Sequence, residues 1–191
     1  MTAQSLRRVS RLAGPVGAVF ALSAILVATA VSATFSWAES ALSDLGVAPA
    51  TALLFNGGLA VGGLVALGYS LALWTADRAV AVCYTLCAVA MILVGVFPSD
   101  TAAHYPAAVS FFLLLTLTLG VDGVRRRETT TGRVSFVLAA VSLAAWPLWW
   151  TLDVGSGIAV PEFVGAVSLA VWVVGLSPVA PLRTRVSRRR R

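Results

Sequence analysis

The chain has 191 residues, of which 59% are hydrophobic and 12% are charged, and its formal net charge is +6. Soluble domains carry about twice this share of charged residues, about 25%. The composition therefore excludes a soluble enzyme, a disordered protein and a disulfide-rich secreted scaffold. It predicts a single integral membrane domain that covers residues 1–191.

Six apolar stretches are long enough to cross a bilayer as helices, which takes about 20 residues each. Prolines stand near several of their ends, where the missing N–H of proline is tolerated. We therefore expect an all-α fold, a polytopic transmembrane bundle of six helices. The expected spans are 13–35, 50–74, 79–97, 106–123, 134–152 and 161–178, followed by a basic tail over 179–191.

The arginine residues predict the orientation of this bundle. All 14 basic residues are arginine, and they precede the first span, follow the sixth, or lie between the second and third or the fourth and fifth. With six spans these segments share one side of the membrane, which the positive-inside rule makes the cytoplasmic side. We expect a multi-pass protein of the cell membrane with its N- and C-termini inside.

The basic start allows an alternative in which the first apolar stretch is a cleaved signal peptide. That stretch is longer than the apolar part of a typical signal peptide, so we favour a membrane span. The arginines lie in short runs beside apolar spans, which argues against binding of nucleic acid. We expect them to contact membrane lipids through anionic headgroups, at about 1 kcal/mol for each residue near the surface.

The second span carries a face of small residues, Gly58, Gly62 and Ala66, at four-residue spacing. Such a face lets two transmembrane helices approach closely. We expect it to pack against another helix of the same chain, and a homo-oligomer is the alternative.

The side opposite the arginines carries the candidate functional site. The spacing Ser36-x-x-Glu39 predicts a capping box that opens a short helix through Leu45, closed by Gly46. Its leucines are expected to face the membrane. Five polar residues of this side are expected to form one ligand-binding mouth: Ser43, Asp44, Asn56, Asp100 and His104.

The acidic residues on the arginine side have a different expected role. Asp77, Asp122 and Glu128 each lie near arginines in the sequence. We interpret them as members of surface ion pairs, which contribute little to stability.

The polar mouth supports three functions. The first is binding or handling of a lipid or another amphiphile. The second is a membrane-embedded hydrolase, in which Asp44, Asp100 and His104 bind a metal ion or act as acid and base. The third is a non-catalytic assembly partner. No hydrolase, phosphate-loop or cofactor motif is present, so we expect no cofactor and no resident metal.

Two pieces of the sequence carry a family resemblance. The first is Leu42-Ser43-Asp44-Leu45-Gly46, with Pro49 and Phe55-Asn56, and the second is Phe97-Pro98 with His104 ahead of Ala107, Ala108 and Phe111. Over residues 13–178 their order resembles the prokaryotic membrane family called domain of unknown function 998. More distantly, they are similar to the eukaryotic Frag/DRAM/Sfk multi-span family, which is associated with lipid-anchor remodelling and autophagy. Neither resemblance implies catalytic residues.

Overall fold

A computed structural model describes residues 3–181 of the chain, and this part contains six long α-helices and no strand. A 3-10 helix, η1 (Leu42–Gly46), follows the first helix, and a π-helical turn, η2 (Trp172–Leu176), continues the last one. The α-helices are α1 (Ala3–Val31), α2 (Ala52–Trp74), α3 (Arg78–Val96), α4 (His104–Arg125), α5 (Thr130–Leu152) and α6 (Ala159–Val171).

The prediction of six membrane-spanning helices is confirmed. Each helix, with α6 and η2 taken together, is long and apolar enough to cross a membrane. The predicted bounds differ most at the first helix, which begins at Ala3 and not at residue 13. Arginine is a good helix former, so α1 continues through Arg7, Arg8 and Arg11. Residues 182–191, with the arginines of the predicted tail, lie outside the described residues.

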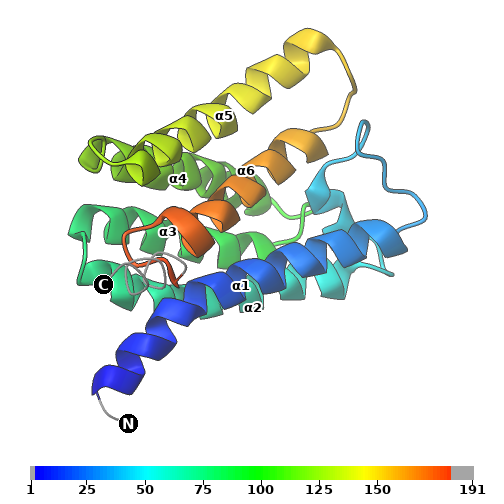
Figure 1. The fold of residues 1–191 in the computed structure, drawn as a ribbon. Coiled ribbons are helices and arrows are strands. Elements are labelled where there is room, and N and C mark those ends of the chain that lie inside the picture. The colour runs from blue at the N-terminus through cyan, green and yellow to red at the C-terminus, as the bar shows by residue number, and fades with distance from the viewer. Residues whose placement is uncertain (1–2, 182–191) are drawn as a thin grey trace.

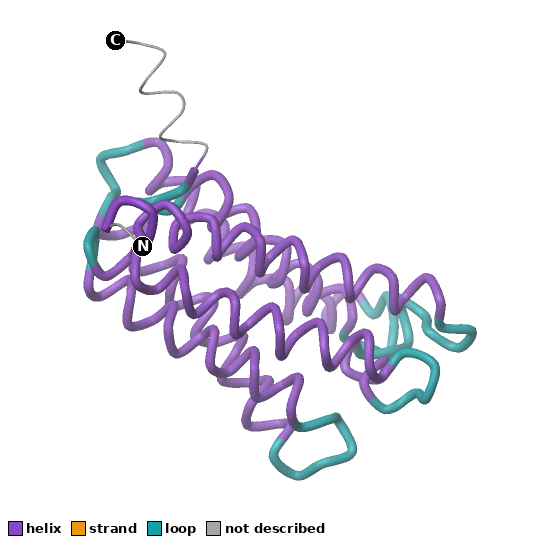
Figure 2. The backbone as a smooth tube through the Cα atoms, turned by 90° about the horizontal axis from the view of Figure 1, so that it is seen from below, coloured by secondary structure: helices purple, strands orange, loops and turns teal. Residues whose placement is uncertain are grey.

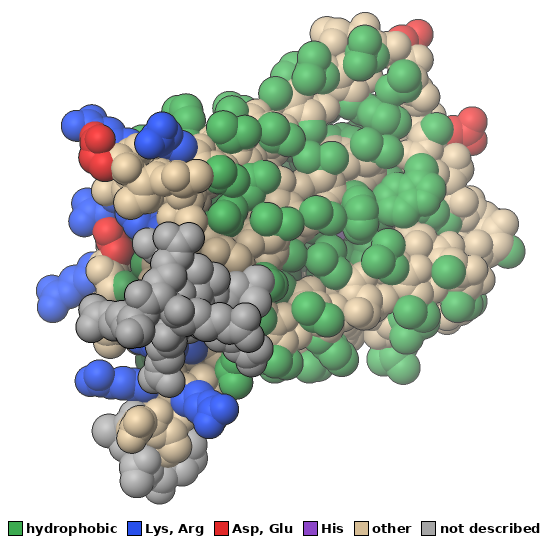
Figure 3. Space-filling view, in the orientation of Figure 1, with side chains coloured by type: hydrophobic (Ala, Val, Ile, Leu, Met, Phe, Trp, Pro, Cys, Tyr) green, Lys and Arg blue, Asp and Glu red, His purple; other side chains and the backbone are tan. Residues whose placement is uncertain are grey.

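Successive helices pack against each other from α1 to α5, and α6 closes the bundle by contacting α1, α4 and α5 (Figure 1). The long helices run side by side with their connecting loops at the two ends (Figure 2). The arginines gather at one end, which we call the basic end (Figure 3). The opposite end holds η1 and the loops that follow α1, α3 and α5, and we call it the η1 end.

The small-residue face of α2 packs against α1 of the same chain. A Cβ added at Gly58 would lie 2.3 Å from Cβ of Ala24, and one added at Gly62 would lie 2.9 Å from Cβ of Ala21. Ala66, the third member of this face, is buried as well. The two backbones therefore approach more closely than larger side chains would allow.

Candidate functional site

The short helix η1 inserts into its end of the bundle, where it contacts α1, α2 and α6. Leu42 and Leu45 are only 4% and 1% exposed. The expectation that these leucines face the membrane is therefore wrong. They lie three residues apart on one side of η1, and that side packs into the helix bundle.

The predicted capping box at Ser36 and Glu39 does not form. Glu39 is exposed, and the N–H of Ser36 donates to Oγ of Ser40 at 3.1 Å. The η1 turn is closed at its own start, where Oδ2 of Asp44 accepts from the N–H of Ala41 at 2.8 Å. The side chain of Asp44, three residues after Ala41, thus caps the turn. The helix η1 begins later than the sequence suggested.

Gly46 ends η1 for a reason other than the expected left-handed cap. No glycine in residues 3–181 has a positive φ. A Cβ added at Gly46 would lie 2.5 Å from Oδ1 of Asn56. Close packing against Asn56 therefore requires glycine here, and Nδ2 of Asn56 donates to the carbonyl of Gly46 at 2.8 Å.

Side chains from three other parts of the chain hold the backbone of η1. They satisfy groups that a five-residue helix leaves unpaired. Oε2 of Glu162 accepts from the N–H of Leu42 at 2.6 Å, and Glu162 is 6% exposed. Oγ of Ser99 donates to the carbonyl of Ser43 at 3.2 Å, and Oγ1 of Thr51 donates to the carbonyl of Leu45 at 2.7 Å.

The loop before η1 also docks on the loop between α5 and α6. The carbonyl of Ser40 accepts from the N–H groups of Ile158 and Ala159 at 3.0 and 2.9 Å. A Cβ added at Gly157 would lie 2.3 Å from the same carbonyl. These contacts tie the start of α6, and with it Glu162, to the η1 end of the bundle.

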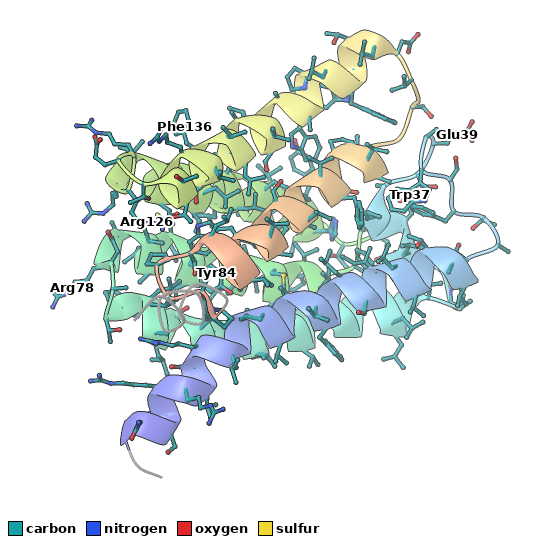
Figure 4. All side chains as sticks on the ribbon, viewed as in Figure 1. Trp37, Glu39, Arg78, Tyr84, Arg126 and Phe136 are labelled. Carbon is teal, nitrogen blue, oxygen red and sulfur yellow. The ribbon has the colours of Figure 1, made fainter. Side chains whose placement is uncertain are left out.

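A cavity of about 80 Å³ lies inside the bundle beneath η1, between α1, α2, α3, α4 and α6. Along α2 it extends from Phe55 to Ala66, about 16 Å at a rise of 1.5 Å per residue. Its wall is almost wholly apolar. The polar side chains in the wall near η1 are Ser43, His104 and Glu162. Tyr84, labelled in Figure 4, lines the wall deeper in the bundle.

Two of these polar side chains have capacity left for a ligand. Nδ1 of His104 lies 2.7 Å from the carbonyl of Phe97. A carbonyl oxygen only accepts, so Nδ1 carries the hydrogen and Nε2 of the neutral ring is an acceptor. Within residues 3–181, neither Nε2 of His104 nor Oε1 of Glu162 forms a hydrogen bond. The cavity therefore has an apolar body and a polar end.

The structure separates the five residues predicted to form a mouth. Ser43 and His104 line the cavity, and Asn56 holds η1. Asp44 and Asp100 are exposed, and among residues 3–181 no hydrogen bond or ion pair joins either of them to His104. That part of the chain also holds no group of three His, Cys, Asp or Glu residues that could bind a metal ion.

Glu162 is the cavity residue that sequence reasoning missed. It was not among the five residues predicted to form the mouth, and it lies in the first turn of α6. An acidic residue is favoured there by the positive end of the helix dipole. The available signal was its position inside an apolar segment directly after Pro161.

A second buried polar cluster lies at the basic end. Asp122 is 0% exposed and pairs with Arg126, whose Nε donates to Oδ1 of Asp122 at 2.7 Å. Nε1 of Trp172 donates to Oδ2 of Asp122 at 2.8 Å, and Arg126 also donates to the carbonyl of Leu176 at 2.8 Å. The prediction of a surface ion pair at Asp122 is wrong, because η2 covers it.

Aromatic rings connect this cluster to the cavity. The ring of Tyr84 lies 5.5 Å from that of Tyr69 and 5.8 Å from that of Trp172. The hydroxyl of Tyr69 donates to the carbonyl of Val173 at 3.2 Å and also contacts the hydroxyl of Ser177. These rings close the cavity toward the basic end.

The other two acidic residues of the basic end lie nearer the surface, as predicted. Glu128 and Arg127 form an exposed pair. Asp77 caps α3 and pairs with Arg125. Burial raises the pKa of Asp77, but the hydrogen bond from Arg125 and two backbone N–H donors outweigh it, so this pKa lies below its ordinary value.

Comparison with known proteins agrees with the first of the two resemblances seen in the sequence. No curated protein and no solved structure matches the chain. Residues 15–178 match the family described as "Protein of unknown function (DUF998)". Because this match covers most of the chain, including most of α1 and all of the other five apolar helices, the chain belongs to the DUF998 family of membrane proteins.

Proposed function

We propose that this protein binds a lipid or another amphiphile in the cavity beneath η1. The observation that carries the proposal is the division of this cavity into an apolar body and a polar end. Ligand sites are concave and mostly apolar, with a few polar groups that fix the orientation of the ligand. The apolar body faces the tail of the ligand, and the headgroup lies near Ser43, His104 and Glu162.

The polar end selects the chemistry of the headgroup. Glu162 offers its second carboxyl oxygen, Oε1, and His104 offers Nε2, and both can accept hydrogen bonds. A headgroup with amine or hydroxyl donors satisfies both acceptors. Asn56 supports this end by holding η1, while the exposed Asp44 and Asp100 add negative charge around it.

The proposal includes an orientation in the cell membrane. The positive-inside rule favours the basic end on the cytoplasmic side, which directs η1 outward. The ligand then belongs to the outer half of the bilayer. The distant resemblance to the Frag/DRAM/Sfk multi-span family, associated with lipid-anchor remodelling, supports a lipid ligand.

An acid–base hydrolase is the second candidate, because His104 and Glu162 line the same cavity. In that function one of the two moves a proton while the other orients the substrate. The exposed Asp44 and Asp100 do not take part in it. The role of assembly partner has less support, since α1 covers the small-residue face of α2.

The test is photo-cross-linking of the full chain in nanodiscs. The probes are a fatty amine and a fatty acid of equal length, each with a diazirine in the tail. We expect the amine to cross-link to cavity residues of α1, α3 and α6. Ala166→Phe, which fills the cavity, should remove at least nine-tenths of this cross-linking, and Glu162→Gln should remove the preference for the amine.

Ala30→Phe is the matched control, because Ala30 is exposed on α1. This variant should cross-link like the wild type. Cross-links found only on lipid-facing residues, or cavity cross-links that persist in Ala166→Phe, would overturn the proposal. Hydrolysis of an ester analogue of the probe, lost in His104→Ala with binding retained, would favour the hydrolase.

A further inference from the structure

We propose a second lipid site, independent of the cavity beneath η1. In this site an anionic diacyl phospholipid occupies a groove on the surface of the helix bundle, at the basic end. The groove has a volume of about 620 Å³ and lies between α4 and α5, with the start of α3 at its edge. Gly120, Phe136 and Leu143 are among its apolar lining residues, and Arg125 closes one end.

The length of the groove matches one leaflet. On α4 it extends from Thr116 to Arg125, about 13 Å along the helix. Half of the roughly 30 Å hydrocarbon core is about 15 Å. An acyl chain of one leaflet fills this length, whereas a partner transmembrane helix would need an apolar face across the whole core.

Gly120 forms the floor of the groove and leaves room for a tail. The nearest atom to a Cβ added there is Cβ of Ala139, at 3.9 Å. The glycine is therefore not required by packing against another helix of this chain. A larger side chain at this position would extend into the groove.

Two arginines that form no ion pair within the described part of the chain flank the basic end of the groove. Arg78 directly precedes Ala79, which lines the groove, and Arg133 lies three residues before Phe136 on the same face of α5. Both are exposed, and within residues 3–181 neither forms an ion pair.

The carboxylates near this end are already paired. Asp77 is bound to Arg125, and Glu128 to Arg127, so neither neutralises Arg78 or Arg133. In Figure 4, Arg78 and Phe136 lie toward the same end of the bundle. Two uncompensated positive charges beside an apolar groove fit the phosphate of an anionic lipid, each near-surface arginine contributing about 1 kcal/mol.

The experiment uses the full chain, purified in detergent and stripped of lipid. Native mass spectrometry measures retention of phosphatidylglycerol and of phosphatidylcholine with the same acyl chains. We expect the wild type to retain phosphatidylglycerol at least tenfold more strongly, and 1 M salt to remove this preference. Gly120→Leu should lower retention of both lipids at least fivefold. The double variant Arg78→Gln/Arg133→Gln should lower the preference for phosphatidylglycerol and leave retention of phosphatidylcholine unchanged.

Gly57→Leu is the matched control, since a Cβ added at Gly57 also meets its nearest atom at 3.9 Å, outside the groove. It should retain phosphatidylglycerol like the wild type. Equal retention of the two lipids by the wild type, or an unchanged preference in the double variant, would overturn the proposal. The double variant changes only exposed side chains, so it decides the outcome even if Gly120→Leu fails to fold. Photo-cross-linking in the cavity beneath η1 is a separate measurement, so failure of this proposal and failure of the proposed function can be told apart.

Discussion

The acidic residues of this chain differ mainly in how far other parts of the chain bury them. Glu162 and Asp122 are buried, and each supports backbone that departs from the α-helical pattern. Glu162 binds the free N–H at the start of η1, and Asp122 positions Arg126 on the carbonyl of Leu176 at the end of η2. Unpaired backbone groups are costly away from water, so these two residues stabilise irregular turns within the bundle.

Asp77 gives a prediction about pH. Its pKa is lowered in the folded state, so the stability it contributes is present above the unfolded pKa of about 3.9 and is lost as pH falls through the folded pKa. Asn is also a good N-cap. Asp77→Asn should therefore keep the cap of α3, lose the ion pair with Arg125, and be less stable than the wild type at pH 7.

Thermal unfolding in detergent at pH 7 and at pH 3 measures this effect. The difference between wild type and Asp77→Asn should shrink at pH 3. Asp77→Ala, the companion variant, should lose about 1 kcal/mol more than Asp77→Asn at both pH values, because it also lacks the cap. A difference between wild type and Asp77→Asn that grows as pH falls would contradict the assignment.

Among the structural elements, η2 is held at both of its ends by the buried pair of Asp122 and Arg126. In this π-helical turn the carbonyl of Leu176 accepts a hydrogen bond from Arg126, and Nε1 of Trp172 donates one to Asp122. Removing one partner of a buried ion pair leaves an uncompensated charge. We expect Arg126→Ala to lower the free energy of unfolding by about 3–5 kcal/mol.

Arg127→Ala is the control, since its pair with Glu128 is exposed and contributes little. The measurement is unfolding in detergent, together with hydrogen exchange of the amides in η2. Exchange at η2 should accelerate in Arg126→Ala and stay unchanged in Arg127→Ala. Equal stability of the two variants would show that Arg126 does not hold η2.

The long helices could be predicted from the sequence because each one carries its own apolar signal, independent of its neighbours. The burial of η1 could not. Leu42 and Leu45 define an apolar side of a short helix. However, Glu162, whose carboxyl group binds the N–H of Leu42 inside the bundle, is 120 residues away in the chain. Likewise, the spacing of four residues between Asp122 and Arg126 indicated an ion pair. The pair is buried because Trp172 packs over Asp122, which the spacing does not show.

The candidate site was predictable to the same limited extent. Topology correctly placed Ser43 and His104 at one end of the bundle, and both line the cavity. It could not distinguish them from Asp44 and Asp100, because the outward or inward direction of each of these side chains depends on tertiary packing. His104 points inward because the carbonyl of Phe97 accepts its hydrogen.

The whole molecule is asymmetric along its long direction, with arginines at one end and η1 with exposed carboxylates at the other. Cytoplasmic loops retain arginine during insertion, so we expect the basic end inside. Cysteine labelling tests this orientation in a Cys83→Ala/Cys87→Ala background. Asp100 and Thr130 are both exposed and lie at opposite ends of the bundle, which makes them suitable positions.

With an impermeant maleimide, Asp100→Cys should label in intact cells, and Thr130→Cys should label only after lysis. The two positions flank α4, so a single helix separates them and their results must differ if that helix crosses the membrane. Labelling of Thr130→Cys alone in intact cells would reverse the orientation and move the cavity's polar end to the cytoplasmic side. Labelling of both in intact cells would contradict the membrane crossing of α4 itself.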